Sequence, residues 1–190
     1  MEKSITFISD FFGVIAGEMA PIFFAKHFKE KGKEIKNHYF EKTDLGIMTF
    51  EDTLKSICND YSFSLDEVKK EFDSYIKVNN EVITLLKKVK EKANLVLLSN
   101  AGEHIVEDIL KRFDINDLFD CQFISYKFGI AKPNPSFYQL AKNSTPKANK
   151  FYMLDDNPSN LVGLNKIGIE SILFKNTKQL KIDLIERNLI

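Results

Sequence analysis

The sequence contains little glycine, proline, cysteine or arginine, and each shortage narrows what the protein can be. Eight glycines and five prolines exclude a fibrous repeat and are too few for a disordered chain. The two cysteines, Cys58 and Cys121, lie far apart without metal-ligand spacing, so we expect two buried, reduced thiols. Arginine occurs only at Arg112 and Arg187, which limits bidentate recognition of carboxylate or phosphate groups.

Net charge and long apolar segments are also absent. The 27 basic residues balance 27 acidic ones, so no long-range field draws the chain to nucleic acid or to an anionic membrane. No apolar run approaches transmembrane length, and the N-terminal sequence MEKSITFISDFF does not resemble a signal peptide. We therefore expect a cytoplasmic monomer or homodimer that acts on a small molecule.

The order of apolar segments predicts an α/β fold. Helical patterns alternate with short apolar runs, which implies right-handed crossovers and a parallel sheet covered on both faces. At 190 residues the chain can bury one core and carry a small cap. The predicted strands are 5–8, 95–98, 123–124, 151–154 and 172–174, and the predicted helices between them are 82–92, 104–113, 135–143 and 158–167.

The segment 16–80 breaks this alternation, because it contains several helical patterns and no convincing strand. One of its helices follows Ser64, with Glu67 three residues later, which is the pattern of a capping box. We interpret the segment as a helical cap inserted after the first strand, with 1–15 and 81–190 forming the core domain. The alternative is an extra helical layer of the same core. The helices predicted within the segment are 19–31, 50–58 and 65–76.

Three predicted strands end in polar residues. Ligands of open parallel sheets bind beyond the carboxyl ends of the strands, so these residues mark the expected site. One such end alone would be an ordinary turn or helix cap, but three ends that converge are harder to explain in that way. The three pairs are Ser9-Asp10, Ser99-Asn100 and Asp155-Asp156.

The adjacent carboxylates Asp155 and Asp156 predict a cation site. Two neighbouring anions at a buried strand end repel each other unless a cation lies between them or one of them takes up a proton. If Asp10 emerges beside them, the three carboxylates suit Mg²⁺, which prefers oxygen ligands and is often completed by a substrate phosphate. The alternative is that Asp156 only caps a helix that begins near Pro158.

Two further segments are candidates for binding an anion. The turn Ser99-Asn100-Ala101-Gly102 offers a hydroxyl and free backbone N–H groups, although any strand-to-helix turn uses such residues. Lys132 lies in a loop stiffened by two prolines and would neutralise charge during phosphoryl transfer if it faces a phosphate. Considered alone, it would be an ordinary surface lysine.

Taken together, these segments resemble the haloacid dehalogenase-like (HAD) superfamily, whose four motifs follow the same order. The resemblance covers all of the chain except the cap sequence. It implies that Asp10 is the nucleophile and that the fourth motif includes Asp155, Asp156 and Asn160. The motifs are ISDFFGVI with Asp10, LVLLSNAG with Ser99, GIAKPNPSFY with Lys132, and FYMLDDNPSNLVGLNKIGI.

More narrowly, DDNPSN with the downstream Gly-Ile and SILF resembles a branch of phosphatases. That branch includes bacterial sugar-phosphate (glucose-1-phosphate) phosphatases and the N-terminal phosphatase domain of soluble epoxide hydrolases. The resemblance implies a Rossmann-like three-layer core, a small helical cap after the first strand, and hydrolysis through an aspartyl phosphate. It also implies Mg²⁺ bound by Asp10, the Phe12 carbonyl and Asp156, with Asp155 close by, and a phosphoryl group held by Ser99, the Asn100 amide and Lys132.

The sequence departs from the family pattern at Phe12, where phosphatases usually carry a second aspartate as general acid. A backbone carbonyl is available from any residue, so the predicted metal site survives the change. Acid–base catalysis does not, and its loss typically costs about two to four powers of ten in rate. The second departure, Asn134 in place of an acid in the third motif, is expected to have little effect.

Phe12 leaves three functional hypotheses. A phosphatase can still act on substrates with good leaving groups, or with an acid supplied by the substrate or the cap. A protein of impaired turnover would bind a phosphorylated ligand or a partner. A 2-haloacid dehalogenase is the third, because those relatives place an aromatic residue after the nucleophile, but they work without metal and use a cap arginine, which 16–80 lacks.

Overall fold

The structure is a computed structural model that describes residues 3–190, so the first two residues of the predicted core segment 1–15 lie outside the described part. A five-stranded sheet in the order β3-β2-β1-β4-β5 forms its centre, and all neighbouring strands are parallel. The predicted α/β fold is therefore confirmed. The strands are β1 (Ile5–Ser9), β2 (Asn94–Ser99), β3 (Cys121–Ile124), β4 (Lys150–Asp155) and β5 (Glu170–Leu173).

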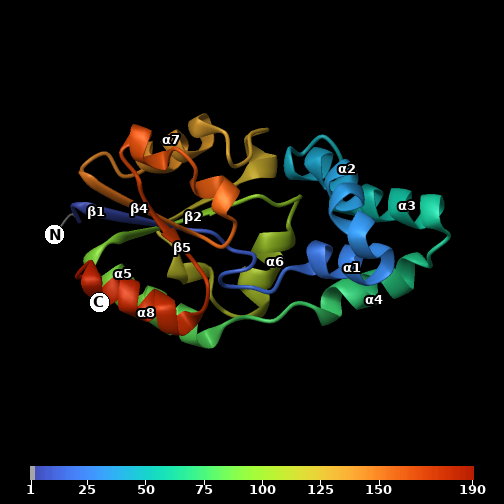
Figure 1. Ribbon diagram of the computed structural model, residues 1–190, viewed down its shortest axis with the longest axis horizontal. Helices are drawn as coiled ribbons and strands as arrows, with labels where there is room; N and C mark the ends of the chain where they lie inside the picture. Colours follow the sequence, from blue (N-terminus) through green and yellow to red (C-terminus); the bar gives the residue numbers. More distant parts are fainter. Residues whose placement is uncertain (1–2) are drawn as a thin grey trace.

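Helices cover both faces of the sheet and make a three-layer core (Figure 1). Successive strand residues alternate between two apolar clusters, because side chains of a strand point to opposite faces. Phe7 and Leu97 belong to one cluster, and Ile8 and Leu98 belong to the other. The first cluster includes residues of α5 (Asn80–Lys92), α6 (Ile105–Arg112) and α8 (Thr177–Glu186), and the second includes residues of α7 (Pro135–Asn143).

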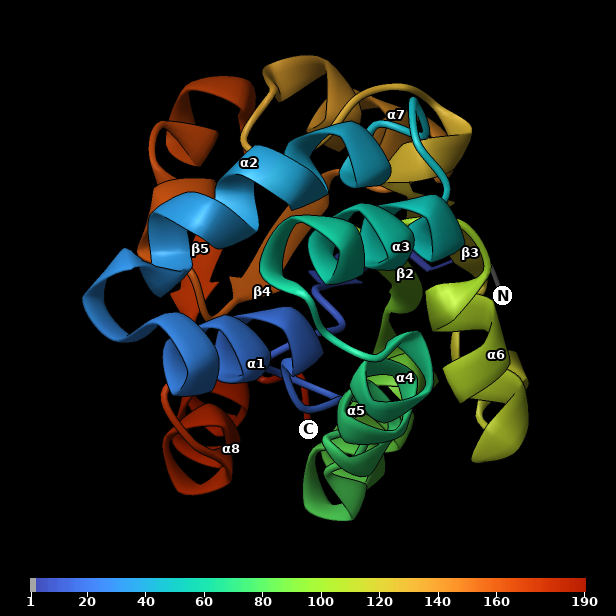
Figure 2. The same ribbon diagram turned by 90° about the vertical axis from the view of Figure 1, so that its right-hand side faces the viewer.

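Four helices between β1 and α5 form what we call the helical insert. They gather at the end of the molecule opposite the chain termini (Figures 1 and 2). The two connections to the core run side by side, since Ala16 pairs with Val78 and the Asn79 N–H donates to the Ile15 carbonyl at 2.8 Å. Whether the insert is a separate domain with the bounds 16–80 stays a prediction. Its helices are α1 (Met19–Phe28), α2 (Gly32–Asp44), α3 (Phe50–Tyr61) and α4 (Leu65–Ser74), with a 3₁₀ turn, η1 (Lys29–Lys31), between the first two.

Several helices begin at side-chain caps that the sequence provides. Thr49 accepts the Asp52 N–H at the start of α3, and Asn79 accepts the Val82 N–H at the start of α5, which satisfies donors that have no partner within the helix. The longest α-helices have only 13 residues. Within residues 3–190, no helix has the length and apolar character needed to cross a bilayer.

Three local predictions need correction. The predicted helix 158–167 is instead two 3₁₀ turns, η4 (Pro158–Leu161) and η5 (Leu164–Ile167), because the intervening Gly163 takes a left-handed φ of 77°. Ser64 does precede α4, but its side chain makes no capping hydrogen bond, since it is exposed and water can compete for it. Of the two thiols, both are free, but Cys121 is only partly buried, because it lies on the edge strand β3.

Candidate active site

The sheet order brings the three polar strand ends together. The central strand β1 lies between β2 and β4, with Ser9 paired to Leu97 on one side and to Leu154 on the other. The Asp10 N–H continues this pairing and donates to the Leu154 carbonyl at 2.8 Å. From β1 the chain continues to β2 and β3 on one side of the sheet, and it then returns to β4 and β5 on the other side. The end of β1 therefore lies at the switch point, where ligands of such folds bind.

Three carboxylates meet at this point. Asp10, Asp155 and Asp156 each offer an oxygen atom, and these atoms all lie within 4.8 Å of one another. Asp155 is fully buried and Asp10 is 6% exposed. Burial, followed by repulsion from Asp155, raises the pKa of Asp156, and burial with the same repulsion raises the pKa of Asp10 well above its ordinary value despite the nearby Lys132. Burial and the neighbouring carboxylate both disfavour the ionised forms, which a hard divalent cation would stabilise, so this donor set fits Mg²⁺.

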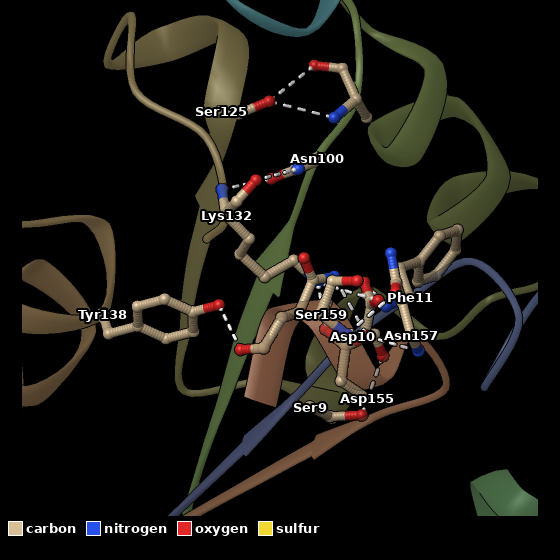
Figure 3. Close-up of polar contacts among 12 residues, drawn as sticks. Ser9, Asp10, Phe11, Asn100, Ser125, Lys132, Tyr138, Asp155, Asn157 and Ser159 are labelled. Atoms are coloured by element: carbon tan, nitrogen blue, oxygen red, sulfur yellow. Dashed lines mark hydrogen bonds and ion pairs between the residues drawn. The ribbon is translucent and has the colours of Figure 1, made fainter. Parts of the chain in front are cut away.

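Lys132 is a buried cation beside Asp10 and Asp155 (Figure 3). Its ammonium Nζ lies 2.7 Å from Asp10 Oδ2 and 2.6 Å from Asp155 Oδ2, with 1% of the side chain exposed. Burial acts to lower the pKa of Lys132, but the two carboxylates outweigh it and raise that pKa. Lys132 is therefore a charged structural bridge between two strand ends, and the surface-lysine interpretation is wrong.

Asn100 holds the backbone of Lys132 in place. Its Oδ1 accepts the Lys132 N–H at 2.8 Å, and its Nδ2 donates to the Lys132 carbonyl at 2.9 Å. The peptide bond from Lys132 to Pro133 is cis. The sequence drew attention to the backbone N–H of Asn100 as a phosphate donor, whereas this two-point contact of its side chain links the turn after β2 to the loop that carries Lys132.

Besides Lys132, two groups hold the Asp155 carboxylate through three hydrogen bonds. The Asn160 Nδ2 lies 3.1 Å from each of its oxygens, and the Asn157 N–H donates to Oδ1 at 2.9 Å. Tyr138 in turn donates its hydroxyl to the Asn160 carbonyl at 2.6 Å. Asn157, not Asp156, caps the turn that follows, so the alternative role of Asp156 as a helix cap is wrong.

Ser99 is the last residue of β2, and Phe12 lies in the loop that follows β1. The Ser99 hydroxyl is buried and has no hydrogen-bond partner among the described residues, which is costly unless a ligand or water completes it. Phe12 is partly buried, and its ring meets Phe11 edge-on with a centroid distance of 5.1 Å. It brings no proton donor to the site.

Gly13 is a site residue that the sequence analysis missed. Its φ is 76°, and a Cβ at this position would lie 2.2 Å from Asp156 Oδ2. The loop after β1 therefore passes directly against the Asp156 carboxylate, and only glycine combines that conformation with that approach. The glycine three residues after Asp10 is the signal that could have revealed it.

A cavity of about 300 Å³ opens above the carboxylates and is lined by both the core and the helical insert. The core contributes Asp10, Phe12 and Lys132, and the insert adds aromatic side chains such as Phe40. Three charged residues near or within the insert also line it: Glu18, Lys36 and Asp44. No motif indicated them, because their positions depend on how the insert docks on the core.

Comparisons with known proteins agree with this fold. A model of the haloacid dehalogenase-like hydrolase family matches residues 6–168. The chain is 26% identical over 155 residues to drimenol cyclase of Aspergillus calidoustus, a match that covers 77% of this chain but only 29% of the cyclase. The structure superposes on a predicted HAD-like family hydrolase from Porphyromonas gingivalis with a TM-score of 0.75 at 17% identity, covering 98% of both chains. It also superposes on a HAD family enzyme of Bacteroides thetaiotaomicron in complex with magnesium and inorganic phosphate, with a TM-score of 0.73 at 20% identity, covering 92% of this chain and 95% of that one. At these identities the two structural matches show the fold.

Proposed function

The chain belongs to the haloacid dehalogenase-like hydrolase family, and from this premise we propose that it hydrolyses a small phosphomonoester such as a sugar phosphate, with Mg²⁺ and an aspartyl-phosphate intermediate. One observation carries the proposal: oxygen atoms of three carboxylates lie within 4.8 Å of one another at the switch point of the sheet, and a buried lysine contacts two of these carboxylates. The magnesium and phosphate bound by the Bacteroides enzyme of the same fold support it.

Asp10 is the proposed nucleophile. The Phe11 N–H donates to its Oδ1 at 2.7 Å and Lys132 contacts its Oδ2, so the carboxylate is held in one orientation at the floor of the cavity. Because the carboxylate is already oriented, it loses less entropy on reaching the transition state than a free nucleophile would. A carboxylate oxygen of Asp10 attacks phosphorus, and water later releases phosphate from the aspartyl ester.

Asp10, Asp156 and the Phe12 carbonyl would hold the metal ion, with Asp155 beside them. Bound Mg²⁺ would offset the repulsion between the anionic nucleophile and the anionic phosphate. Lys132, the Asn100 N–H and the unpaired Ser99 hydroxyl would bind the phosphoryl oxygens as charge moves onto them. Asn100 holds the backbone of the lysine, and Asp10 and Asp155 hold its ammonium group at the floor of the cavity.

Removal of the metal tests this proposal. We expect hydrolysis of an activated aryl phosphate to fall by at least about 10²-fold in EDTA and to return when Mg²⁺ is added, because several kcal/mol of charge stabilisation are lost. Phosphate release from a panel of aryl and alkyl phosphates measures this. Undiminished activity in EDTA would contradict the mechanism, and a chain inactive on the whole panel would favour a phosphate-ligand-binding protein.

The same panel separates the dehalogenase hypothesis. The segment 16–80 contains no arginine that could bind the carboxylate of a 2-haloacid. We therefore expect no halide release from 2-haloacids in either the Mg²⁺ or the EDTA arm. Halide release in EDTA, without phosphatase activity, would replace the proposed function by dehalogenation.

Substitution of Phe12 by aspartate tests how much the missing acid matters. We expect Phe12→Asp to raise kcat/KM for alkyl phosphates by up to about 10²-fold and for aryl phosphates far less, because only poor leaving groups require a proton. Phe12→Asn is the matched control, since it changes size and polarity in the same way without adding an acid. An equal change for both substrate classes would show that Phe12 acts through its shape.

A further inference from the structure

The loss of the usual acid at Phe12 leaves the leaving group without a proton donor from the core. Whatever protonates it must line the cavity, carry an exchangeable proton and not already be engaged by another side chain. Asp10 and Asp156 do not qualify, since one is the proposed nucleophile and the other a proposed metal ligand. Two further carboxylic acids line the cavity, Glu18 at the start of α1 and Asp44 at the end of α2.

We propose that Asp44 of the helical insert is the general acid and base of this site, a role that rests on the proposed phosphatase function. No hydrogen bond or ion pair joins its carboxyl group to another residue of the 3–190 range. It shares the cavity with Asp10 and Lys132. Asp44 belongs to the helical insert, which lines the cavity together with the core. The core groups in this cavity are those that would bind the phosphoryl group.

The end of α2 is held firmly against the core. Gly102, in the turn after β2, lies so close to Thr43 that a Cβ there would be 2.5 Å from the Thr43 Cγ2, and a Cβ on Gly46 would be 2.5 Å from the Tyr126 carbonyl oxygen. Thr43 is fully buried, and its hydroxyl lies 2.5 Å from that of Thr53 on α3. Asp44 lies between these two contacts, so its position relative to the core is fixed by the residues on both sides.

The surroundings of Asp44 favour a proton that is available near neutral pH. Burial raises the pKa of Asp44 to about 6, and Glu41 adds to the rise, while Lys36 and Lys132 oppose it. As the last residue of α2, Asp44 also meets the negative end of the helix dipole, which disfavours its ionised form. The other charged groups of the cavity are Glu18, Asp10 and Asp156. A general acid is most effective when its pKa lies near the working pH.

The reaction balances with Asp44 in this role. An Asp10 oxygen bonds to phosphorus while the bond from phosphorus to the leaving oxygen breaks, and the Asp44 proton moves to that oxygen, so a neutral alcohol departs. The Asp44 carboxylate then takes a proton from water as the water oxygen bonds to phosphorus and the bond to Asp10 breaks. Phosphate is released, and both carboxyl groups return to their starting states.

The test compares Asp44→Asn with Glu18→Gln, which changes a carboxyl to an amide in the same cavity. With Mg²⁺ present, we expect Asp44→Asn to lower kcat/KM about 10²-fold for an alkyl phosphate and less than about tenfold for an activated aryl phosphate. In the parent, alkyl phosphate hydrolysis should fall as pH rises above about 6, and this fall should be absent in the Asp44→Asn variant. Glu18→Gln should change both substrates by the same factor, and Phe12→Asp should restore more alkyl activity in the Asp44→Asn variant than in the parent.

Two outcomes would overturn the role of Asp44 while leaving the proposed function intact. One is an equal loss on both substrates with an unchanged pH profile, and the other is a loss selective for alkyl phosphates in Glu18→Gln alone. A parent chain without Mg²⁺-dependent hydrolysis of either substrate would overturn the proposed function and this assignment together. The aryl activity of the parent therefore distinguishes the two failures.

Discussion

Replacement of Asp10 by asparagine is expected to abolish phosphoryl transfer, lowering kcat/KM by about 10⁴- to 10⁶-fold, as for other removed nucleophiles. Asparagine keeps the shape of the side chain but cannot form the ester with phosphorus. Hydrolysis of an activated aryl phosphate with Mg²⁺ measures the loss. Mass spectrometry of acid-quenched reactions should show a phosphorylated Asp10 peptide in the parent and none in the variant.

The variant should keep its fold, which separates a chemical effect from unfolding. Asp10 is buried and burial raises its pKa, so a neutral amide of the same shape removes a charge that this site disfavours. We therefore expect Asp10→Asn to unfold at the same temperature as the parent or at a higher one in EDTA. Asp66→Asn, at an exposed position on α4 outside the cavity, is the matched control and should leave activity unchanged. Activity that survives Asp10→Asn would contradict the covalent mechanism.

Much of the core followed from sequence because local patterns and general topology agree there. Apolar runs at 5–8, 95–98 and 151–154 are buried on both faces, so their pattern is continuous and typical of parallel strands. The polar residues after them, such as Asp10 and Asp156, converge because parallel strands all end at the same edge of the sheet. This geometry needs no knowledge of side-chain packing.

The parts that the sequence did not reveal depend on contacts between distant segments. The apolar residues Leu161, Leu164 and Ile167 repeat every three positions, a spacing that fits an α-helix and a series of 3₁₀ turns alike. The left-handed Gly163 decides between them. Asp44 had no motif around it, because its place in the cavity results from the packing of α2 against Gly102 and Tyr126. The position of such residues of the helical insert follows from the three-dimensional packing and not from a local motif.

Replacement of Lys132 by methionine is expected to have the largest effect on stability and a large effect on activity. Its ammonium group is the buried partner of both Asp10 and Asp155, and removal of one partner of a buried ion pair typically costs about 3–5 kcal/mol. Activity should also fall by about 10²- to 10³-fold, because charge on the phosphoryl oxygens loses a fixed donor. Urea unfolding and aryl phosphate hydrolysis measure the two effects.

The pH dependence of this destabilisation identifies its cause. The folded pKa of Asp10 lies above its ordinary value, so over the pH interval between the unfolded and the folded pKa the folded state holds a proton that the unfolded chain releases. The metal-free protein therefore loses stability as pH rises through this interval. Without Lys132 the pKa of Asp10 rises further, and the interval widens upward. The difference in unfolding free energy between parent and Lys132→Met should therefore grow with pH in EDTA and shrink when Mg²⁺ supplies a positive charge.

Lys142→Met is the matched control for this measurement. Lys142 is partly buried, and its ammonium group donates to the neutral Ile167 carbonyl at 2.6 Å and packs over the Phe151 ring. Its loss should lower stability by an amount that neither pH nor Mg²⁺ changes, because no carboxylate is left unpaired. If Lys132→Met shows the same flat profile, the lysine stabilises the fold by packing alone, and the charge balance inferred for the three carboxylates is wrong.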